Sequence, residues 1–381
     1  MPRWTLREAV RWEIGLLIAV LAVLTMHPIG YVTAGLVIIA LLSVGVPIGG
    51  QSLLDRIGAR LSFRSRARER VDEPDQPVEL VPLAQWLPGL SVNQTRSARG
   101  DDVGVITDGV SWTALLGLDS DDELLADTGE RIELAALNGL TVQDDIVFAA
   151  LQVITFTVPA PSVVMVGAGS PAVTSYREIS RADAPPAVRR TWIGVRLDPR
   201  LCLEAVASRG SSNDAIYATL RFGLHRVQSA LKRQGIDTHE LSAREIFDVL
   251  ALTSGASPEG GPQRSVEHWD HWECDGFIHR GRRVESWGDN TSLGYQAVLD
   301  VLDDAPIVFG LTSFTLDRDN HASGAVRIVT TDVSSATSVD EWMAGQLDGR
   351  VSLRPGGGDQ VPAMLTTVPL GRDIASAGVR A

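Results

Sequence analysis

The stretch that decides the architecture of this chain lies near the N-terminus and reads IGLLIAVLAVLTMHPIGYVTAGLVIIALLSVGVPI (residues 14–48). No charged residue occurs between Glu13 and Asp55, a window of about 41 residues, and one bilayer-spanning helix needs roughly 20. Met26-His27-Pro28-Ile29-Gly30 interrupts this window with the Pro and Gly that are typical of a turn between helices. The stretch therefore predicts two transmembrane helices joined by a short turn.

We place this transmembrane hairpin at residues 14–50, with its helices at about 14–26 and 29–48. A cleaved signal peptide is the alternative, with an apolar core over 14–24. However, a second apolar segment follows at once in place of a small-residue cleavage site. The hairpin is therefore favoured.

Small residues inside the hairpin follow the small-xxx-small spacing that lets two membrane helices approach closely. The predicted packing positions are Gly30, Ala34, Gly45 and Gly49.

The distribution of arginine predicts the orientation of the hairpin. Arg3, Arg7 and Arg11 precede it, six further Arg follow over 56–70, and the short loop between the helices has no Lys or Arg. Because positive charge is retained on the cytoplasmic side, both termini are predicted to be cytoplasmic. The chain would then be a two-pass protein of the cell inner membrane, with its large C-terminal part in the cytosol.

A basic juxtamembrane helix is predicted over residues 51–72. Arg56, Arg60, Arg64 and Arg68 repeat every four residues and so share one helical face. Such a face is suited to contact with anionic lipid headgroups. The alternative is that these arginines set the topology and do nothing more.

The net charge of −13 is unevenly distributed along the chain. Residues 1–70 carry nine Arg against four acidic residues, about +5, so the remainder carries about −18. A strongly acidic domain argues against nucleic-acid binding, because a phosphate backbone requires a basic surface. Cys202 and Cys274 are the only cysteines, too few for a disulfide scaffold, which fits a reducing compartment.

The cytosolic part is predicted to be α+β (mixed α/β), possibly in two lobes, because strand and helix patterns mix without strict alternation. No internal repeat is evident. The predicted organisation is a cytoplasmic N-terminus (1–13), the hairpin and basic helix, a linker (73–94), lobe 1 (95–253), a Gly/Pro-rich linker (254–263) and lobe 2 (264–375).

Runs of β-branched and apolar residues predict the strands of this region. They lie at 103–106, 110–116, 147–158, 163–166, 192–197, 277–287, 309–316 and 325–331. Helical periodicity and capping patterns predict helices at 212–234, from Ser242, at about 292–302 and at 338–347.

The segment Glu267-His268-Trp269-Asp270-His271-Trp272-Glu273-Cys274 concentrates residues that can ligate metal, with His279 shortly after it. The residues that would supply zinc ligands are His268, His271, Cys274 and His279. Their spacing matches no closed zinc module, and in a strand His271 and Cys274 would point to opposite faces. We therefore assign no metal and no cofactor.

Sequence signatures of catalysis are missing as well. The chain contains no G-x-S-x-G, Walker loop or HExxH. Adjacent carboxylates such as Asp144 and Asp145 rarely face one site and are interpreted as solvated surface charge. We predict no catalytic residues and no enzymatic activity.

Several short motifs resemble those of EccE, a membrane component of the mycobacterial and actinobacterial type VII (ESX) secretion systems. They are Arg190-Thr191-Trp192-Ile193-Gly194-Val195-Arg196-Leu197-Asp198-Pro199, Ala207-Ser208-Arg209-Gly210, His279-Arg280 before Trp287, and Thr366-Thr367-Val368-Pro369-Leu370-Gly371. The order of parts is also similar: a short Arg-bearing start, a two-helix hairpin, a basic helix and a cytosolic domain of about this size.

The resemblance implies a non-enzymatic subunit that stabilises the secretion complex at its cytoplasmic face and periphery. It would sit beside EccB, EccC and EccD, with EccC supplying ATP hydrolysis. The alternative is a membrane-anchored cytosolic enzyme, such as a transferase using lipid-linked or nucleotide-activated substrates, which fold analogy alone does not exclude.

Overall fold

The computed structural model describes residues 53–96, 102–118, 133–160, 187–210, 212–260, 264–354 and 356–372, together with positions 13, 14, 17, 18, 20, 21, 23, 24, 31–35, 37, 38, 100, 170, 171 and 175. The chain divides into two units, Met1–Ser65 and Arg66–Ala381, which we describe separately.

In the first unit, the described positions between 13 and 38 are helical. Large apolar side chains at these positions are exposed: Ile14, Leu17, Ile18, Val20, Leu21, Val23, Leu24, Tyr31, Val32 and Ile38. Of the helices within the described residues, none has both the length and the apolarity required to cross a bilayer. The predicted hairpin lies largely outside the described residues and stays a prediction.

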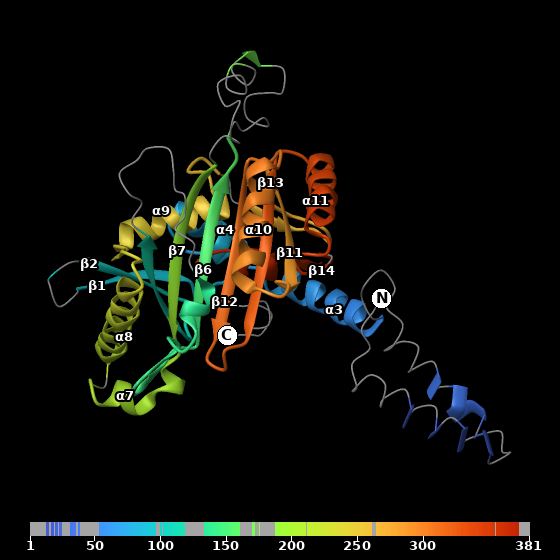
Figure 1. Cartoon of the computed structure of the whole chain (residues 1–381), viewed down its shortest axis with the longest axis horizontal. Coiled ribbons are helices and arrows are strands. Elements are labelled where there is room, and N and C mark those ends of the chain that lie inside the picture. The colour runs from blue at the N-terminus through green and yellow to red at the C-terminus, as the bar shows by residue number, and fades with distance from the viewer. Residues whose placement is uncertain are drawn as a thin grey trace. The chain divides into compact units, whose positions relative to one another are not determined.

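In the described residues of the second unit, twelve strands form one antiparallel sheet, on which the unit is built (Figure 1). The strands run in the order β1-β2-β3-β7-β6-β12-β13-β11-β10-β9, with β8 paired to β3 and β14 paired to β11. Their bounds are β1 (Ser91–Arg96), β2 (Asp102–Thr107), β3 (Trp112–Leu118), β6 (Ala150–Val158), β7 (Val188–Leu197), β8 (Thr238–Glu240), β9 (Ser265–Glu267), β10 (Trp272–Cys274), β11 (Phe277–Ser286), β12 (Phe309–Asp317), β13 (Ala322–Thr330) and β14 (Ser352–Arg354). β4 (Val142–Gln143) and β5 (Ile146–Val147) form a separate small sheet.

The strand order repeats, although the sequence shows no repeat. β1, β2, β3, β6, β7 and β8 are connected and paired in the same way as the six strands from β9 to β14. In each half, the last four strands have the order 4-1-3-2 of the ferredoxin-like βαββαβ motif. β6 and β12 pair along the seam between the halves, from Thr157 opposite Gly310 to Ala150 opposite Asp317.

The helices also repeat in part. α8 (Asn213–Arg233) and α11 (Val333–Leu347) each join the fifth strand of a half to its sixth, and α9 (Ala243–Ser254) and α12 (Gln360–Thr366) each follow the sixth. Among the described residues, the halves differ between their third and fourth strands, where the second half has α10 (Thr291–Asp304) and the first has the short 3-10 helix η2 (Leu134–Leu137). The remaining elements are α3 (Leu53–Glu69), η1 (Val78–Leu80), α4 (Val81–Ala84), η3 (Pro199–Leu201) and α7 (Leu203–Ala207).

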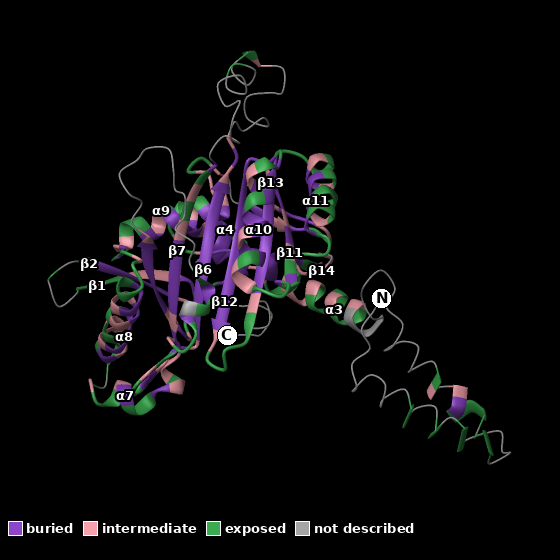
Figure 2. Ribbon diagram, in the orientation of Figure 1, coloured by how far each residue is buried: buried purple, intermediate pink, exposed green. Residues whose placement is uncertain are grey.

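The sheet lies between two apolar layers, and its central strands are buried (Figure 2). α8, α10 and α11 pack on one face, where alternate strand residues such as Leu151 and Val153 point. α4, α9 and α12 pack on the other face, with Ile154 and Phe156. Because both faces are covered, the central strands are apolar runs with little polar alternation.

The α+β class is confirmed, and so are most of the predicted elements. α9 begins with the predicted capping box between Ser242 and Glu245. α11 begins at Val333, earlier than predicted, because Asp332 caps it by accepting a hydrogen bond from the Ser335 N–H at 2.9 Å. Its first turns are rich in Ser and Thr, which have low helix propensity, so the sequence pattern did not predict a helix there. The predicted strand at 163–166 lies outside the described residues.

Candidate functional site

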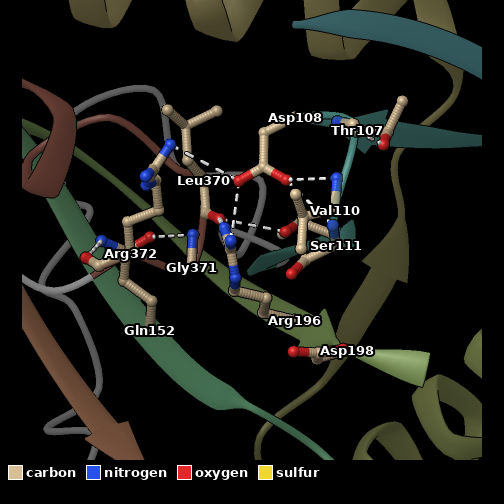
Figure 3. Close-up of polar contacts among 12 residues, drawn as sticks. Thr107, Asp108, Val110, Ser111, Gln152, Arg196, Asp198, Leu370, Gly371 and Arg372 are labelled. Atoms are coloured by element: carbon tan, nitrogen blue, oxygen red, sulfur yellow. Dashed lines mark hydrogen bonds and ion pairs between the residues drawn. The ribbon is translucent and has the colours of Figure 1, made fainter. Parts of the chain in front are cut away.

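A buried polar site of the second unit begins in the turn between β2 and β3. Asp108 is almost fully buried there, and its Oδ1 accepts hydrogen bonds from the N–H groups of Ser111 (2.9 Å) and Val110 (3.2 Å). An Asp that closes a turn on its own following backbone is a local consequence of sequence. The turn thereby presents Oδ2 toward the neighbouring strands (Figure 3).

Arg196 of β7 meets this carboxylate. Its Nη2 lies 2.7 Å from Asp108 Oδ2, and its Nη1 donates to the carbonyl oxygen of Leu370 at 2.9 Å. The guanidinium of Arg372 also reaches Asp108, with Nη1 at 3.4 Å from Oδ2. Burial by itself would raise the pKa of Asp108, but Arg196, the Ser111 N–H and Arg372 outweigh it and the pKa is lowered.

Gln152 of β6 completes the site from within an apolar strand. It is fully buried; its side-chain carbonyl accepts from the Gly371 N–H at 2.7 Å, and its amide donates to the Thr366 carbonyl at 2.6 Å. Thr113 of β3 donates to the Leu370 carbonyl at 3.0 Å. Three strands of the first half therefore hold the segment that follows α12.

Gly371 is required where this segment passes Arg196. Its φ of +66° lies in the left-handed region, and a Cβ at this position would lie 2.6 Å from the Cβ of Arg196. The strand motif 190–199 and the closing motif 366–371 are thus in direct contact. Both oxygens of Asp108 already accept from donors, so this site, the C-terminal clamp (Asp108, Gln152, Arg196, Gly371 and Arg372), holds backbone in place and presents no free acid or base.

A second buried ion pair joins the last turn of α3 to the edge strand β9. Arg66 donates to both carboxylate oxygens of Glu267 at 2.9 and 3.0 Å, and also to the Gly358 carbonyl. Glu267 Oε1 in addition accepts from the Val361 N–H at 2.9 Å. Burial raises the pKa of Glu267 against the lowering effect of Arg66. We call Arg66 and Glu267 the helix latch.

Arg70 extends this contact by one helical turn. It donates to the Ser265 carbonyl at 2.7 Å, and its guanidinium lies over the ring of Trp86 at 5.9 Å. The Trp86 indole N–H donates to the Ser265 hydroxyl at 2.7 Å. Arg70, directly after α3, is therefore tied to the segment after α4 and to β9.

The four predicted metal candidates separate into two environments. His279 is fully buried beside Arg327, whose Nη1 is 3.0 Å from His279 Nδ1, and burial together with this cation lowers the pKa of His279 well below its ordinary value. Cys274 is also fully buried, and burial raises the pKa of its thiol. His268 and His271 instead lie together at the β9–β10 turn with Glu273.

Arg327 is the most deeply buried cation of the described residues. It is 1% exposed, donates to the Thr253 carbonyl and lies 5.9 Å from the centre of the Trp272 ring. Burial lowers its pKa to about 9. A cation this deep beside His279 disfavours a second positive ion there, so His279 is poorly suited to metal.

The predicted lipid-facing arginines lie on α3. Arg60, Arg64 and Arg68 are exposed and Arg56 is partly buried. The predicted packing positions Gly30, Gly45 and Gly49 lie outside the described residues, while Ala34 is described and buried.

Sequence reasoning did not single out Asp108, Gln152, Arg372, Arg66 or Glu267 as site residues. Two signals point to part of this set. Asp108 precedes Gly109 in a turn sequence, and Gln152 interrupts an otherwise apolar run. The long-range partners of these residues have no local signature.

Together these features define an α+β domain whose buried polar residues hold its own chain segments in place. Residues 185–283 of this domain match the family model EccE, described as "Putative type VII ESX secretion system translocon, EccE". The match covers about a quarter of the chain and confirms the resemblance to the EccE family that the motifs indicate. No curated protein matches the chain.

Proposed function

We propose that this chain is a non-enzymatic structural subunit of a type VII (ESX) secretion membrane complex, which it stabilises at the cytoplasmic face and periphery. The observation that carries the proposal is the family match over 185–283. That segment contains Arg196 of the C-terminal clamp and Glu267 of the helix latch. The matched region therefore includes side chains that give the domain its shape.

The buried carboxylates support a structural role. Asp108 and Glu267 each accept from a guanidinium group and from backbone N–H groups. A general acid or base needs a proton-transfer path to a substrate, and these groups are occupied in holding chain segments. Such contacts rigidify a domain, which suits a subunit that acts by contact with its neighbours.

Membrane anchorage by the two-pass hairpin, with both termini cytoplasmic, is part of the same proposal. Its support is the uncharged window between Glu13 and Asp55, the arginines on both sides of it, and the exposed apolar side chains at the described positions of 14–38. The partners proposed are EccB, EccC and EccD, together with anionic lipid headgroups that would meet Arg60, Arg64 and Arg68.

The test is extraction of the full chain, carrying a C-terminal affinity tag, from its native membrane in mild detergent. We expect it to co-elute with EccB, EccC and EccD in one large assembly on a native gel, with the components identified by mass spectrometry. The matched control is the same chain without residues 1–50, which should be recovered without the assembly. Recovery of the full chain as a lone monomer or dimer would contradict the proposal.

The stabilising role has its own measurement. In cells that lack this chain, the assembly of EccB, EccC and EccD should run smaller or be recovered in lower amount, and expression of the full chain should restore it. An assembly of unchanged size and amount would contradict the stabilising role, but it would not contradict membership of the complex.

A further inference from the structure

We infer that the β9–β10 hairpin binds a divalent transition-metal ion of the Zn²⁺ class through His268, His271 and Glu273. This inference does not depend on the proposed function.

The strand register places the three side chains on one face of the hairpin. β9 and β10 pair with Glu273 opposite Val266 and Trp272 opposite Glu267, and the turn is closed by the His268 N–H donating to the His271 carbonyl at 2.8 Å. His268 and His271 are therefore the next pair across the hairpin. Since side chains alternate along a strand, Glu273 shares the face of His271.

The opposite face of the hairpin is occupied by the domain core. Glu267, Trp272 and Cys274 point that way and are buried. Cys274, which the sequence suggested as a ligand, is thus on the wrong face to join His271. The ligand set that the fold assembles replaces the thiol by the Glu273 carboxylate.

The three ligand atoms already lie close together. One ligand atom from each side chain falls within 4.8 Å of the others, and His268 Nε2 lies 3.6 Å from Glu273 Oε2. The two imidazole rings are stacked with their centres 4.3 Å apart. The side chains of His268 and Glu273 are 44% and 47% exposed, which leaves both room to rotate toward one ion.

A neighbouring carboxylate orients one of the ligands. Asp270 Oδ1 lies 2.9 Å from His271 Nδ1. An Nδ1–H that donates to a carboxylate leaves the lone pair on Nε2, and this arrangement is the usual support of a metal-binding histidine. His271 is also the least exposed of the three, with its side chain 11% exposed.

The donor set selects the kind of ion. Two imidazoles and one carboxylate suit Zn²⁺ and its neighbours in the transition series, whereas Mg²⁺ and Ca²⁺ prefer oxygen ligands throughout. Three protein ligands leave a fourth tetrahedral position, which water would fill. The site would be open and exchangeable, unlike a closed structural zinc site.

A second group of similar composition serves as the comparison. Asp317, Asp319 and His321 lie together at the end of β12, but Asp317 Oδ1 already accepts from the N–H groups of Asp319 (2.9 Å) and His321 (2.7 Å). One imidazole and a carboxylate engaged in a turn make a weaker donor set than two imidazoles on a paired hairpin.

The test uses the full chain in detergent, purified without a polyhistidine tag. Zn²⁺ affinity is measured by competition with a chromogenic chelator, and ligation is measured by the visible d–d absorption of bound Co²⁺. We expect one Zn²⁺ per chain and a tetrahedral Co²⁺ spectrum. His268→Ala and His271→Ala should each raise the Kd for Zn²⁺ by at least about tenfold and remove that spectrum. Asp270→Asn should raise the Kd by about tenfold to a hundredfold.

The matched control is His321→Ala, which should leave affinity and spectrum unchanged. Glu273→Gln, which keeps the shape of the side chain, provides a ligand variant that preserves the hairpin. The inference is overturned if wild-type protein binds no stoichiometric Zn²⁺, if His268→Ala and His271→Ala bind it as wild type does, or if only His321→Ala loses it.

Discussion

Arg196 and Leu370 are 174 residues apart in the chain, yet the Arg196 guanidinium donates to the Leu370 carbonyl at 2.9 Å while it also pairs with Asp108. One side chain of the first half thus holds the turn after β2 and the segment after α12. Through Arg196, the contact holds Asp108 and Leu370 together, two residues that are 262 positions apart in the chain.

Removing Arg196 should therefore destabilise the domain strongly. Arg196→Met leaves the buried Asp108 carboxylate with Arg372 as its remaining cation, and breaking a buried pair in this way costs about 3–5 kcal/mol. The measurement is the free energy of unfolding of the full chain in detergent, followed by tryptophan fluorescence in denaturant. Arg200→Met is the control, because Arg200 pairs with Asp198 at the surface. A loss no larger than that of the control would contradict the clamp.

Gly371→Ala should destabilise the protein more than Gly349→Ala. Both glycines have positive φ, +66° and +76°, which disfavours any side chain by about 1–2 kcal/mol. Only at Gly371 would the new Cβ also meet Arg196; nothing lies within 4 Å of a Cβ at Gly349. The difference between the two unfolding free energies measures the clamp contact, and equal losses would show that backbone conformation alone matters.

The helix latch should behave as a buried pair. Arg66→Ala leaves Glu267, whose side chain is 2% exposed, without its cation, and we expect a loss of about 3–5 kcal/mol. The double substitution Arg66→Met and Glu267→Leu should recover part of this loss, because no buried charge is left. Arg68→Ala, on the exposed side of the same helix, is the control and should change stability little. Equal effects of Arg66→Ala and Arg68→Ala would refute the latch.

The buried carboxylates of Asp108 and Glu267 should give opposite pH dependence. The pKa of Asp108 is lowered in the folded state, so its contribution is complete above its unfolded pKa of about 4 and is lost as pH falls through the folded pKa. The pKa of Glu267 is raised, so its contribution is present below the unfolded pKa and is lost as pH rises through the folded pKa. Unfolding free energies measured across the acid range should show a smaller acid loss in Asp108→Asn and a smaller loss with rising pH in Glu267→Gln. Unchanged profiles would contradict these signs.

The predicted topology of the hairpin is open to cysteine labelling. Both native cysteines, Cys202 and Cys274, are buried in the folded domain and should react slowly with a membrane-impermeant maleimide. In the variant His27→Cys, the new cysteine should be labelled from outside in intact cells. In the variant Arg68→Cys, the new cysteine should be labelled only after lysis. Labelling of the Arg68 position in intact cells would reverse the orientation.

Local sequence rules predicted the elements well and their partners poorly. The capping box at Ser242 and the helix over 212–234 depend on residues a few positions apart, so the sequence shows them directly. The pairing of β6 with β12 places Ala150 opposite Asp317, and the sequence near either residue contains no signal that predicts this pairing. The repeat was not detected in the sequence because a strand order depends on which positions are buried. Many different residues can fill a buried position, so two halves of the same topology need not have similar sequences.

The candidate site shows the same division. The sequence pattern pointed to His268 and His271 as metal ligands. The strand register was needed to show that the third member of this group is Glu273, in place of Cys274 and His279. Arg196 and Leu370 both lie in motifs noticed in the sequence, yet only the fold reveals that these motifs touch.

The repeated strand order has a consequence for the history of the chain. The two halves have one topology and pair in antiparallel fashion along β6 and β12. This arrangement is the one expected of a two-fold symmetric homodimer whose subunits were fused into one chain. In such a fusion each copy is released from the need to match the other. Within the described residues, one half has the helix α10 where the other has η2, and one half places a histidine hairpin at the sheet edge where the other places β1 and β2. The asymmetries between the twins are therefore where specialised roles would have arisen after the fusion.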